Sequence, residues 1–328
     1  MAVNSSARRV VIYGAGAIGS VVGGLLARGG KDVILLGRSG HVEAISQKGL
    51  RLVTPAATYS LSVTAVFSLE QIAFGEGDVV FLCVKSHDTE ESLRQLRAAA
   101  PDIPVFCFQN GVRNEEVASR YFERVYGVKV SAPCVFLTYG EVTAVREPPG
   151  WFVMGRYPTG TDDLVESVAA DMRSAGFYVL VTPDIMPHKW GKLIDNLGNA
   201  VGAITDARGG EANRIAGAAR EEATEVLAQA GVRWVSAEAL AQEWPDSAIK
   251  PRVLETRAQS STWQSLARQQ RTVESEFFNG EIVRLARQLG RRAPVNETLL
   301  RISEQMAARG ELPGRYTPAE LSRMAGLA

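Results

Sequence analysis

Gly14-Ala15-Gly16-Ala17-Ile18-Gly19 lies near the start of the chain, between an apolar β-rich run over residues 9–13 and a helix-like stretch over residues 20–28. A second apolar run follows at residues 32–36. Strand, G-x-G-x-x-G, helix and strand in this order are typical of the first βαβ unit of a dinucleotide-binding fold. The three glycines then serve a tight turn, a close approach of the backbone to a pyrophosphate, and close packing of helix on strand. The stretch predicts a nucleotide site at the helix N-terminus; the alternative is a glycine-rich turn beside an empty crevice.

The end of the second apolar run indicates which dinucleotide is preferred. In NAD-binding proteins an acidic residue commonly ends this strand and bonds the ribose 2′-hydroxyl. Here Arg38 follows the strand, and no carboxylate occurs between Leu36, at the end of the run, and Glu43. Because a guanidinium offers a fixed fork of donors suited to phosphate, we predict NADP(H) rather than NAD(H). The alternative is a solvated loop arginine.

The overall composition limits the classes of protein to consider. A chain of 328 residues can form two domains. Lys+Arg and Asp+Glu balance at 36 each. This balance gives no sign of a basic surface, so we expect neither nucleic acid nor an anionic membrane as a partner. Residues 10–27 are uncharged, but their glycines and their place in a βαβ pattern favour a buried strand–turn–helix over a membrane span. Arg8-Arg9 resembles a twin-arginine signal without a cleavage site. We expect a cytoplasmic protein.

Cysteines and histidines give no sign of a disulfide framework or of a metal site. Cys83, Cys107 and Cys134 each lie in an apolar strand-like run, and an odd count without paired spacing fits reduced, buried thiols. The three histidines are scattered, so no metal-ligand pattern arises. We expect no metal.

The first half of the chain predicts a mostly parallel, doubly wound sheet. Further apolar runs at 79–84 and 104–108 are each followed by polar residues. Since ligands bind outside the carboxyl ends of such strands, Lys85 and Asn110 are expected near a cofactor, with a capping or loop role equally open. Runs at 142–145 and 151–154 predict antiparallel strands that extend the sheet. A helix at 162–175 and a strand at 178–181 complete domain 1–182, because Thr182-Pro183 suggests a boundary.

Domain 183–328 is predicted to be all-α, since β-type runs largely disappear after the boundary. Helices are expected over residues 187–205, 214–230, 234–244, 248–269 and 272–289. Asn279-Gly280 would usually mark a turn, yet helical spacing continues across it. We therefore expect Gly280 to be a close-packing point within a helix.

The segment that opens this second domain carries candidate catalytic chemistry. Lys192, Asn196 and Asn199 lie at i, i+4 and i+7, so one helix is expected to carry them on one face. The alternative is a solvated polar stripe. Asparagine is a poor helix former, and the helix begins at the domain junction, where the nicotinamide end of a cofactor is expected. A lysine there can protonate an oxyanion formed by hydride transfer, with its pKa lowered by burial or a nearby cation.

These elements together resemble the ketopantoate reductases (2-dehydropantoate 2-reductases), NADPH enzymes that make pantoate for coenzyme A. The resemblance runs over almost the whole chain. It rests on the glycine motif, Arg38, Lys85 in Cys-Val-Lys-Ser, Asn110 in Gln-Asn-Gly, Lys192 and Asn196 in Lys-Leu-x-x-Asn, Ser261 in Ser-Ser-Thr-Trp-Gln, and Glu274 ahead of Asn279-Gly280.

The resemblance implies a role for each of these positions. Lys192 would be the general acid, and Asn110 would touch both cofactor and substrate. Asn196 and Asn199 would hold the substrate, and Ser261 or Thr262 would bond its carboxylate. Glu274 would organise cofactor and substrate hydroxyls, and Lys85 would lie near the cofactor ribose. Read alone, a serine in a Ser/Thr cluster such as Ser261 is more often a helix cap, and a glutamate such as Glu274 is more often a solvated helix charge.

Departures from the family pattern cluster on the substrate side. Asn199 falls seven residues after Lys192 and precedes Ala200. In the family this asparagine usually falls eight residues after the lysine and precedes a proline. Ser265 replaces the usual aspartate, with one extra residue before Glu274, and Asp195 places a charge at a usually apolar position. Gly209-Gly210-Glu211 replaces Asn-Gly-Glu. The cofactor prediction is therefore firmer than ketopantoate as the substrate.

The sequence thus predicts an α/β chain with an N-terminal Rossmann-type dinucleotide-binding domain and an all-α C-terminal domain. Its expected activity is NADPH-dependent reduction of a small 2-oxo acid, foremost 2-dehydropantoate. The alternatives are another keto acid, a β-hydroxyacid dehydrogenase-like activity, and a non-catalytic NADP(H) sensor. The oligomeric state stays open, a homodimer included.

Overall fold

A computed structural model describes residues 8–254 and 260–327. Their contacts divide the chain into two compact units. Unit 1 holds the described residues up to Lys189 together with those of segment 236–258, and unit 2 holds the described residues of 190–235 and 259–328. The chain passes from unit 1 to unit 2 after Lys189 and returns to unit 1 after Val235, and the described residues from Ser260 on belong to unit 2. In the described residues no helix is long and apolar enough to cross a lipid bilayer. The predicted domain boundary after Thr182 stays a prediction.

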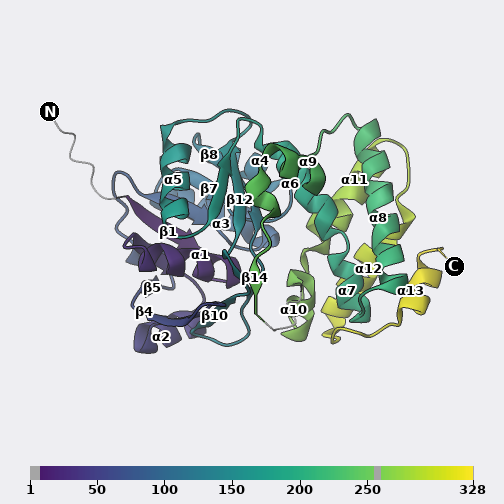
Figure 1. Cartoon of the computed structure of the whole chain (residues 1–328), viewed down its shortest axis with the longest axis horizontal. Helices are drawn as coiled ribbons and strands as arrows, with labels where there is room; N and C mark the ends of the chain where they lie inside the picture. Colours follow the sequence, from purple (N-terminus) through teal and green to yellow (C-terminus); the bar gives the residue numbers. More distant parts are fainter. Residues whose placement is uncertain (1–7, 255–259, 328) are drawn as a thin grey trace. The chain divides into compact units, whose positions relative to one another are not determined.

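Unit 1 is built on an eight-stranded sheet of order β13-β12-β8-β7-β6-β1-β2-β5 (Figure 1). The strands are β1 (Arg9–Tyr13), β2 (Asp32–Leu36), β5 (Thr64–Val66), β6 (Val79–Leu82), β7 (Val105–Cys107), β8 (Val125–Ser131), β12 (Trp151–Arg156) and β13 (Tyr178–Val181). Neighbouring strands are parallel except β8 and β12. The predicted doubly wound sheet is confirmed, as is an antiparallel strand at 151–154.

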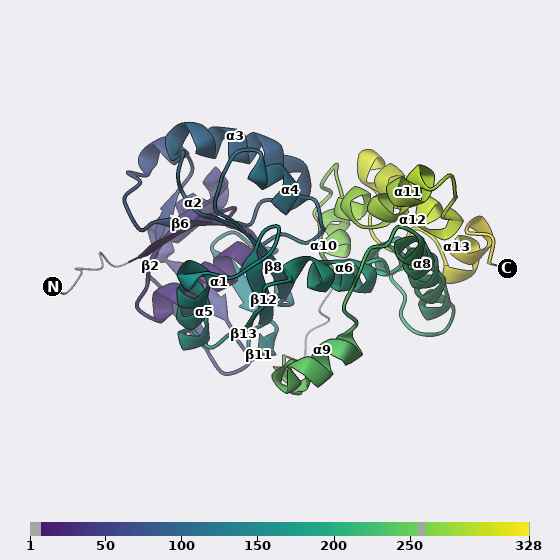
Figure 2. The same cartoon turned by 90° about the horizontal axis from the view of Figure 1, so that it is seen from above.

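Helices cover both faces of this sheet, which explains why its central strands are continuously apolar. Along β1, Val10 and Ile12 join the core beneath α1 (Ala17–Arg28) and α5 (Asp163–Ser174). Val11 and Tyr13 join the opposite core, beneath α3 (Thr89–Ala99) and α4 (Asn114–Ser119). Figure 2 shows the two pairs of helices on opposite sides of the strands. Helix α2 (Ser39–Lys48) follows β2.

A separate four-stranded sheet has the order β4-β3-β10-β9. Its strands are β3 (Leu50–Val53), β4 (Thr58–Leu61), β9 (Cys134–Val135) and β10 (Glu141–Ala144). The expectation that residues 142–145 extend the main sheet is wrong, because β10 pairs with β3 and β9. The alternation in this run encodes which side chains are buried, and both Val142 and Ala144 are buried. A short alternating run does not encode which strand becomes its neighbour.

Segment 236–258 packs on unit 1 with α9 (Ala237–Glu243), the 3₁₀ turn η3 (Pro245–Ala248) and β14 (Arg252–Val253). Strand β14 pairs antiparallel with β11 (Arg146–Glu147). The predicted helix over 248–269 is therefore wrong for residues 248–254, whereas α10 (Ser261–Ala267) confirms it for those residues. Residues 255–259 of the predicted helix lie outside the described residues. Lys250 lies in no helix, as expected for a residue before proline, which is driven out of the helical region.

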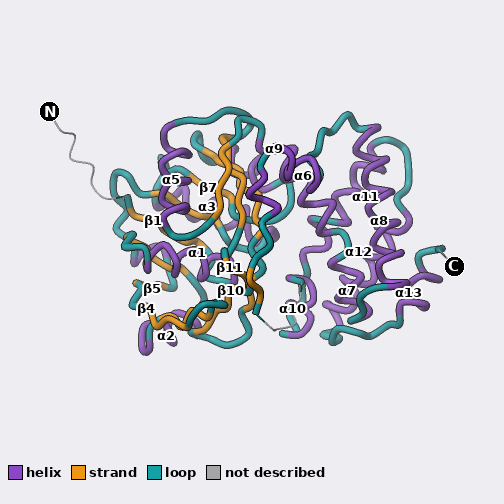
Figure 3. The backbone as a smooth tube through the Cα atoms, in the orientation of Figure 1, coloured by secondary structure: helices purple, strands orange, loops and turns teal. Residues whose placement is uncertain are grey.

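Every element among the described residues of unit 2 is helical, as Figure 3 shows for α7, α8 and α10–α13. Helix α6 (Ile185–Asn196) leads into it, followed by α7 (Asn199–Thr205), α8 (Gly210–Gln229), α10 (Ser261–Ala267), the 3₁₀ turn η4 (Glu274–Phe277), α11 (Asn279–Gln288), α12 (Pro294–Arg309) and α13 (Pro318–Met324). The predicted all-α character is confirmed.

Two predicted helices are interrupted. The helix over 187–205 breaks at Leu197-Gly198, and the helix over 272–289 is replaced by η4 followed by α11. Gly280 is not a close-packing point, because the atoms nearest to a Cβ there, on Leu300 at 3.5 Å and the Ser275 carbonyl oxygen at 3.6 Å, lie at ordinary contact distance. The apolar spacing around it reflects one buried face of α11. Such spacing cannot exclude a 3₁₀ turn at the helix start.

Candidate functional site

The glycine loop joins β1 to α1, and its three glycines meet different surroundings. Gly14 has a positive φ of +113°, and a Cβ there would lie 2.6 Å from the Cys83 carbonyl carbon. A Cβ at Gly19 would clash with the Gly14 carbonyl oxygen and lie 2.7 Å from Ile12. A Cβ at Gly16 would meet nothing within 4 Å. The turn and the packing therefore require Gly14 and Gly19, whereas the space beside Gly16 can admit a ligand.

The start of α1 has the chemistry of an anion site. The first turns of a helix leave backbone N–H groups without intrahelical partners. Gly16 is the N-cap residue of α1, and the first turn carries no acidic side chain. A phosphate would therefore meet donors and the positive end of the helix dipole there.

Two neighbouring loops adjoin the glycine loop at the carboxyl ends of the strands. The Cys83 N–H donates to the Tyr13 carbonyl at 2.7 Å, and the Phe108 N–H donates to the Leu82 carbonyl at 2.9 Å. Since β1 has β2 on one side and β6 on the other, it lies at the switch point of the sheet, where α/β proteins bind ligands. Lys85 and Asn110 follow at this edge, as their sequence positions predict.

Arg38 lies at the same edge, next to the glycine loop. It is an exposed residue at the N-cap position of α2, immediately after β2. The preceding Gly37 is so close to the loop that a Cβ on it would lie 2.9 Å from the Ala15 Cβ. This position suits a guanidinium that reaches a ribose phosphate.

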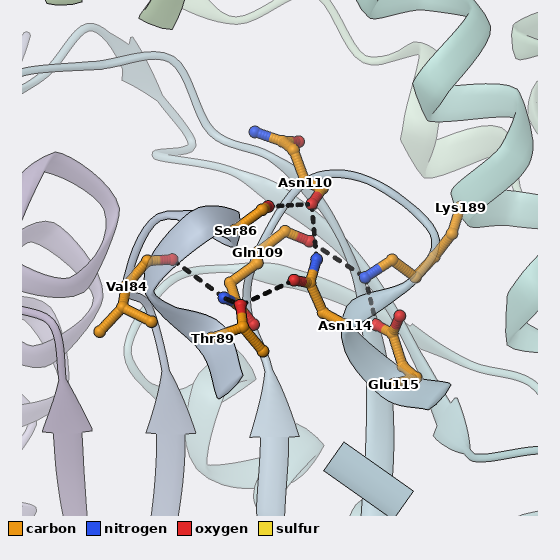
Figure 4. A network of polar contacts seen from close by, with 8 residues as sticks. All are labelled: Val84, Ser86, Thr89, Gln109, Asn110, Asn114, Glu115 and Lys189. Carbon is orange, nitrogen blue, oxygen red and sulfur yellow. Dashed lines mark hydrogen bonds and ion pairs between the residues drawn. The ribbon is translucent and has the colours of Figure 1, made fainter. Parts of the chain in front are cut away.

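A polar network holds the backbone of the Gln109-Asn110 turn (Figure 4). The Gln109 side-chain amide donates to the Val84 carbonyl at 3.0 Å and to Thr89 Oγ1 at 2.7 Å. The Asn114 amide donates to the Asn110 carbonyl at 2.8 Å. In Figure 4 the Asn110 side chain points away from this network. Its amide oxygen is buried and has no hydrogen-bond partner within the described chain, which fits a ligand contact.

An ion pair that sequence reasoning missed belongs to this network. Lys189 on α6 and Glu115 on α4 pair through Nζ and Oε1, and both side chains are buried. Lys189 Nζ also donates to the Gln109 carbonyl at 3.0 Å. Burial raises the pKa of Glu115, although Lys189 acts to lower it. The signal available in the sequence was helical spacing, because Lys189 lies four residues after the apolar Ile185 and so on the same helix face. In the structure both side chains are buried.

Lys192 and Asn196 share a face of α6, but Asn199 lies in the next helix. The prediction of one helix with all three residues on one face is therefore wrong for Asn199. The helix ends at Asn196, and Leu197-Gly198 forms a turn. The side-chain amide of Asn279 donates to the Leu197 carbonyl at 3.3 Å, an acceptor that a continuous helix would use for its own ladder.

Helix α10 places Ser261 and Thr262, the two residues that the resemblance offers for the substrate carboxylate, in different surroundings. Its N-cap is Ser260, whose Oγ accepts from the Trp263 N–H at 3.2 Å, so Ser261 is not the cap. Ser261 is exposed, whereas Thr262 is 2% exposed and its hydroxyl has no partner within the described chain. The Thr262 hydroxyl is therefore better placed than that of Ser261 to gain from a ligand. Glu274 begins η4 and is half-buried.

Two of the substrate-side departures have visible structural consequences. Ser265 is buried, and its hydroxyl donates to the Ser261 carbonyl at 2.9 Å within α10. Gly209 and Gly210 both have positive φ, +78° and +45°, at the start of α8. Asp195 is exposed on α6.

None of the three cysteines, all among the described residues, forms a disulfide, and burial raises the thiol pKa of each one. Cys107 and Cys134 are buried as expected, whereas Cys83 is half-buried. In the described ranges, no three His, Cys, Asp or Glu side chains are grouped as a metal site would need.

The fold and the glycine loop define a class: a Rossmann-type dinucleotide-binding unit followed by a helical unit. Residues 10–159 match the family model "Ketopantoate reductase PanE/ApbA", and residues 184–307 match "Ketopantoate reductase PanE/ApbA C terminal". The chain belongs to the ketopantoate reductase family and is an oxidoreductase acting on CH–OH groups. The predicted resemblance is confirmed.

Named relatives and solved structures agree with this assignment. A 2-dehydropantoate 2-reductase of Archaeoglobus fulgidus is 33% identical over 303 residues, covering 90% of this chain and 96% of that protein. A 2-dehydropantoate 2-reductase of Pyrococcus horikoshii is 31% identical over 296 residues, covering 88% of this chain and 94% of that protein. The crystal structure of a PanE/ApbA family ketopantoate reductase from Ralstonia eutropha is 30% identical, with a TM-score of 0.76, and covers 92% of this chain and 99% of that one. A ternary structure of D-mandelate dehydrogenase with NADH and anilino(oxo)acetate has a TM-score of 0.78 at 20% identity and shows the fold alone.

Proposed function

We propose that this protein reduces a small 2-oxo acid to the 2-hydroxy acid with NADPH, and that its substrate is 2-dehydropantoate, which becomes pantoate on the route to coenzyme A. The relatives named above support the reaction. The observation that carries the proposal is the sheet edge of unit 1, where the open space beside Gly16 adjoins the loops that bear Lys85 and Asn110.

The residues of this edge fit a nicotinamide dinucleotide. The start of α1 would hold the pyrophosphate, Arg38 the 2′-phosphate and Lys85 the ribose, and Asn110 would contact the nicotinamide end. When bound, the cofactor supplies the hydride that the keto carbon accepts. Arg38 in place of a carboxylate favours NADPH over NADH.

Lys192 is assigned as the general acid. As hydride reaches the keto carbon, its oxygen becomes an alkoxide, and Lys192 Nζ donates the proton that gives the hydroxyl. Asn110, Asn196 and Asn199 would orient the substrate, with Ser261 or Thr262 on its carboxylate and Glu274 on cofactor and substrate hydroxyls. The unpartnered hydroxyl of Thr262 favours it over Ser261 for the carboxylate.

Steady-state oxidation of NADPH in the presence of 2-dehydropantoate tests the reaction, with NADH as the comparison cofactor. In Lys192→Ala we expect kcat to fall by about 100-fold or more, the range of general acid catalysis, while NADPH affinity stays near that of the wild type. Lys48→Ala, at an exposed position in the last turn of α2, is the matched control. Near-wild-type turnover of Lys192→Ala would refute the assignment.

Other outcomes of the same assay identify the alternatives. NADPH binding with turnover of another 2-oxo acid would assign the substrate-side departures a role in specificity. NAD(P)⁺-dependent oxidation of 3-hydroxy acids would indicate a β-hydroxyacid dehydrogenase-like enzyme. Binding without any turnover would indicate an NADP(H) sensor. We further propose that the protein acts in the cytoplasm, which fits three cysteines that form no disulfide.

A further inference from the structure

We propose that Lys189 and Glu115 are positioning residues, whose buried ion pair fixes the Gln109-Asn110 turn and so orients the Asn110 side chain for cofactor and substrate. The inference rests on the proposed function, in which Asn110 makes those contacts. Neither residue is assigned a part in proton or hydride transfer.

The pair has the burial and geometry to act on that turn. Lys189 is 2% exposed and Glu115 fully buried. Lys189 Nζ contacts Glu115 Oε1 and donates to the Gln109 carbonyl at 3.0 Å, one residue before Asn110 (Figure 4). A hydrogen bond from a charged donor is shorter and stronger than one between neutral groups. The carboxylate offsets part of the cost of burying the ammonium and holds it beside the Gln109 carbonyl.

The turn is also held from its other side. Ser86 Oγ and the Asn114 amide donate to the Asn110 carbonyl at 3.3 Å and 2.8 Å. Thr89 links the two halves of the network, because its hydroxyl accepts from Gln109 and donates to Asn114 at 2.9 Å. Both carbonyls of the turn are therefore bonded within the protein. The Asn110 amide oxygen has no such bond within the described chain.

A buried ion pair adds little net stability, since desolvation of two charges offsets much of their attraction. An apolar residue at 189 would continue the buried face of α6 that Ile185 begins. An apolar side chain could not, however, donate a hydrogen bond to the Gln109 carbonyl oxygen. The pair thus supplies a fixed orientation that apolar packing does not.

A double-mutant cycle tests the inference. Lys189→Met with Glu115→Leu removes both charges together, so no unpaired charge remains buried. We expect this paired variant to fold and to lose about ten-fold in kcat/KM for 2-dehydropantoate. Placed in an Asn110→Ala background, the same pair should cause less than about a two-fold further loss, because the group it orients is gone. Unchanged activity of the paired variant, or losses that multiply, would overturn the inference.

A second ion pair in unit 1, half-buried at Arg9 and buried at Asp78, provides the matched control. Arg9 and Asp78 pair at 2.5 Å near the amino ends of β1 and β6, at the opposite edge of the sheet. Arg9→Met with Asp78→Leu should lower the melting temperature and leave kcat/KM unchanged. A merely structural role for the first pair would give the same pattern as this control.

The same cycle separates this inference from the proposed function. If the wild-type protein fails to reduce 2-dehydropantoate, the proposed reaction is wrong. The cycle is then read on the dissociation constant for NADPH, which requires no turnover. A loss of NADPH affinity in the paired variant that vanishes in the Asn110→Ala background supports positioning, and independent losses contradict it.

Discussion

Gly16 and Gly19 belong to one motif, yet the structure gives them separate tasks. The open space beside Gly16 predicts that Gly16→Ala leaves the free energy of unfolding unchanged and weakens NADPH binding by about ten-fold or more, near 1.4 kcal/mol. Gly19→Ala should instead cost about 1–3 kcal/mol of stability, because its Cβ would strike backbone and Ile12. Urea unfolding and NADPH titration of both variants decide this. Wild-type affinity in Gly16→Ala would contradict the predicted phosphate site.

His41 couples the start of α2 to two other parts of unit 1. The Gly140 N–H donates to His41 Nδ1 at 2.9 Å, so Nε2 is assigned the hydrogen and bonds Ser20 Oγ at 3.1 Å. The ring lies 4.5 Å from that of Phe136 and is 1% exposed. Burial lowers the pKa of His41 to about 4. A second proton would also break the bond from Gly140.

The lowered pKa of His41 makes stability depend on pH. The unfolded chain protonates this histidine near pH 6.5 and the folded chain only near pH 4, so stability is full above 6.5 and falls as the pH drops through this window. The loss should be on the order of 3 kcal/mol. Urea unfolding between pH 7.5 and 4 measures it, with His41→Gln as the reference. Equal pH dependence of the two proteins would refute the buried neutral imidazole.

At the scale of elements, α8 contains a glycine that its surroundings do not require. A Cβ at Gly217 would meet nothing within 4 Å. Since glycine costs a helix interior about 1 kcal/mol relative to alanine, Gly217→Ala should raise the free energy of unfolding by about that amount at unchanged kcat. Gly191→Ala on α6 is the contrast, because its Cβ would strike the Val235 carbonyl oxygen. Chemical denaturation of both variants is the measurement, and a destabilised Gly217→Ala would contradict the predicted open surroundings.

The break between α6 and α7 shows what element-scale patterns leave out. Spacing placed Lys192 and Asn196 correctly on one helix, because only local geometry decides that relation. It failed for Asn199, since the Leu197 carbonyl accepts from Asn279, 82 residues further along the chain. No local pattern near residue 197 reports a partner at that distance.

At the scale of the whole molecule, segment 236–258 returns to unit 1 after α8. Trp151 Nε1 donates to the Asp246 carbonyl at 2.8 Å, and the Leu254 N–H donates to the Val145 carbonyl at 3.0 Å. Trp151→Phe keeps an aromatic ring on Tyr178 and removes the donor. We expect about 1 kcal/mol of destabilisation and faster amide hydrogen exchange over residues 236–254.

Trp263→Phe provides the control for this prediction. Trp263 Nε1 donates to Asp206 within unit 2 at 2.9 Å, so its loss should destabilise the protein without changing exchange over 236–254. Unaltered exchange in Trp151→Phe would show that the indole bond does not hold the segment.

Sequence alone determined the βαβ start, the mostly parallel sheet and the helical second unit, because glycine spacing and apolar periodicity are local properties of the chain. The family followed from the resemblance of its motifs. Tertiary structure decided the strand partners of β10, the interruptions of two helices, the return of segment 236–258 to unit 1, and the burial of Lys189 against Glu115. The partners of β10, the break after Asn196, the returning segment and the buried pair depend on hydrogen bonds or charges supplied by residues distant in the sequence. A lysine in a sequence is expected to be solvated, and only the structure shows that Lys189 is buried against Glu115.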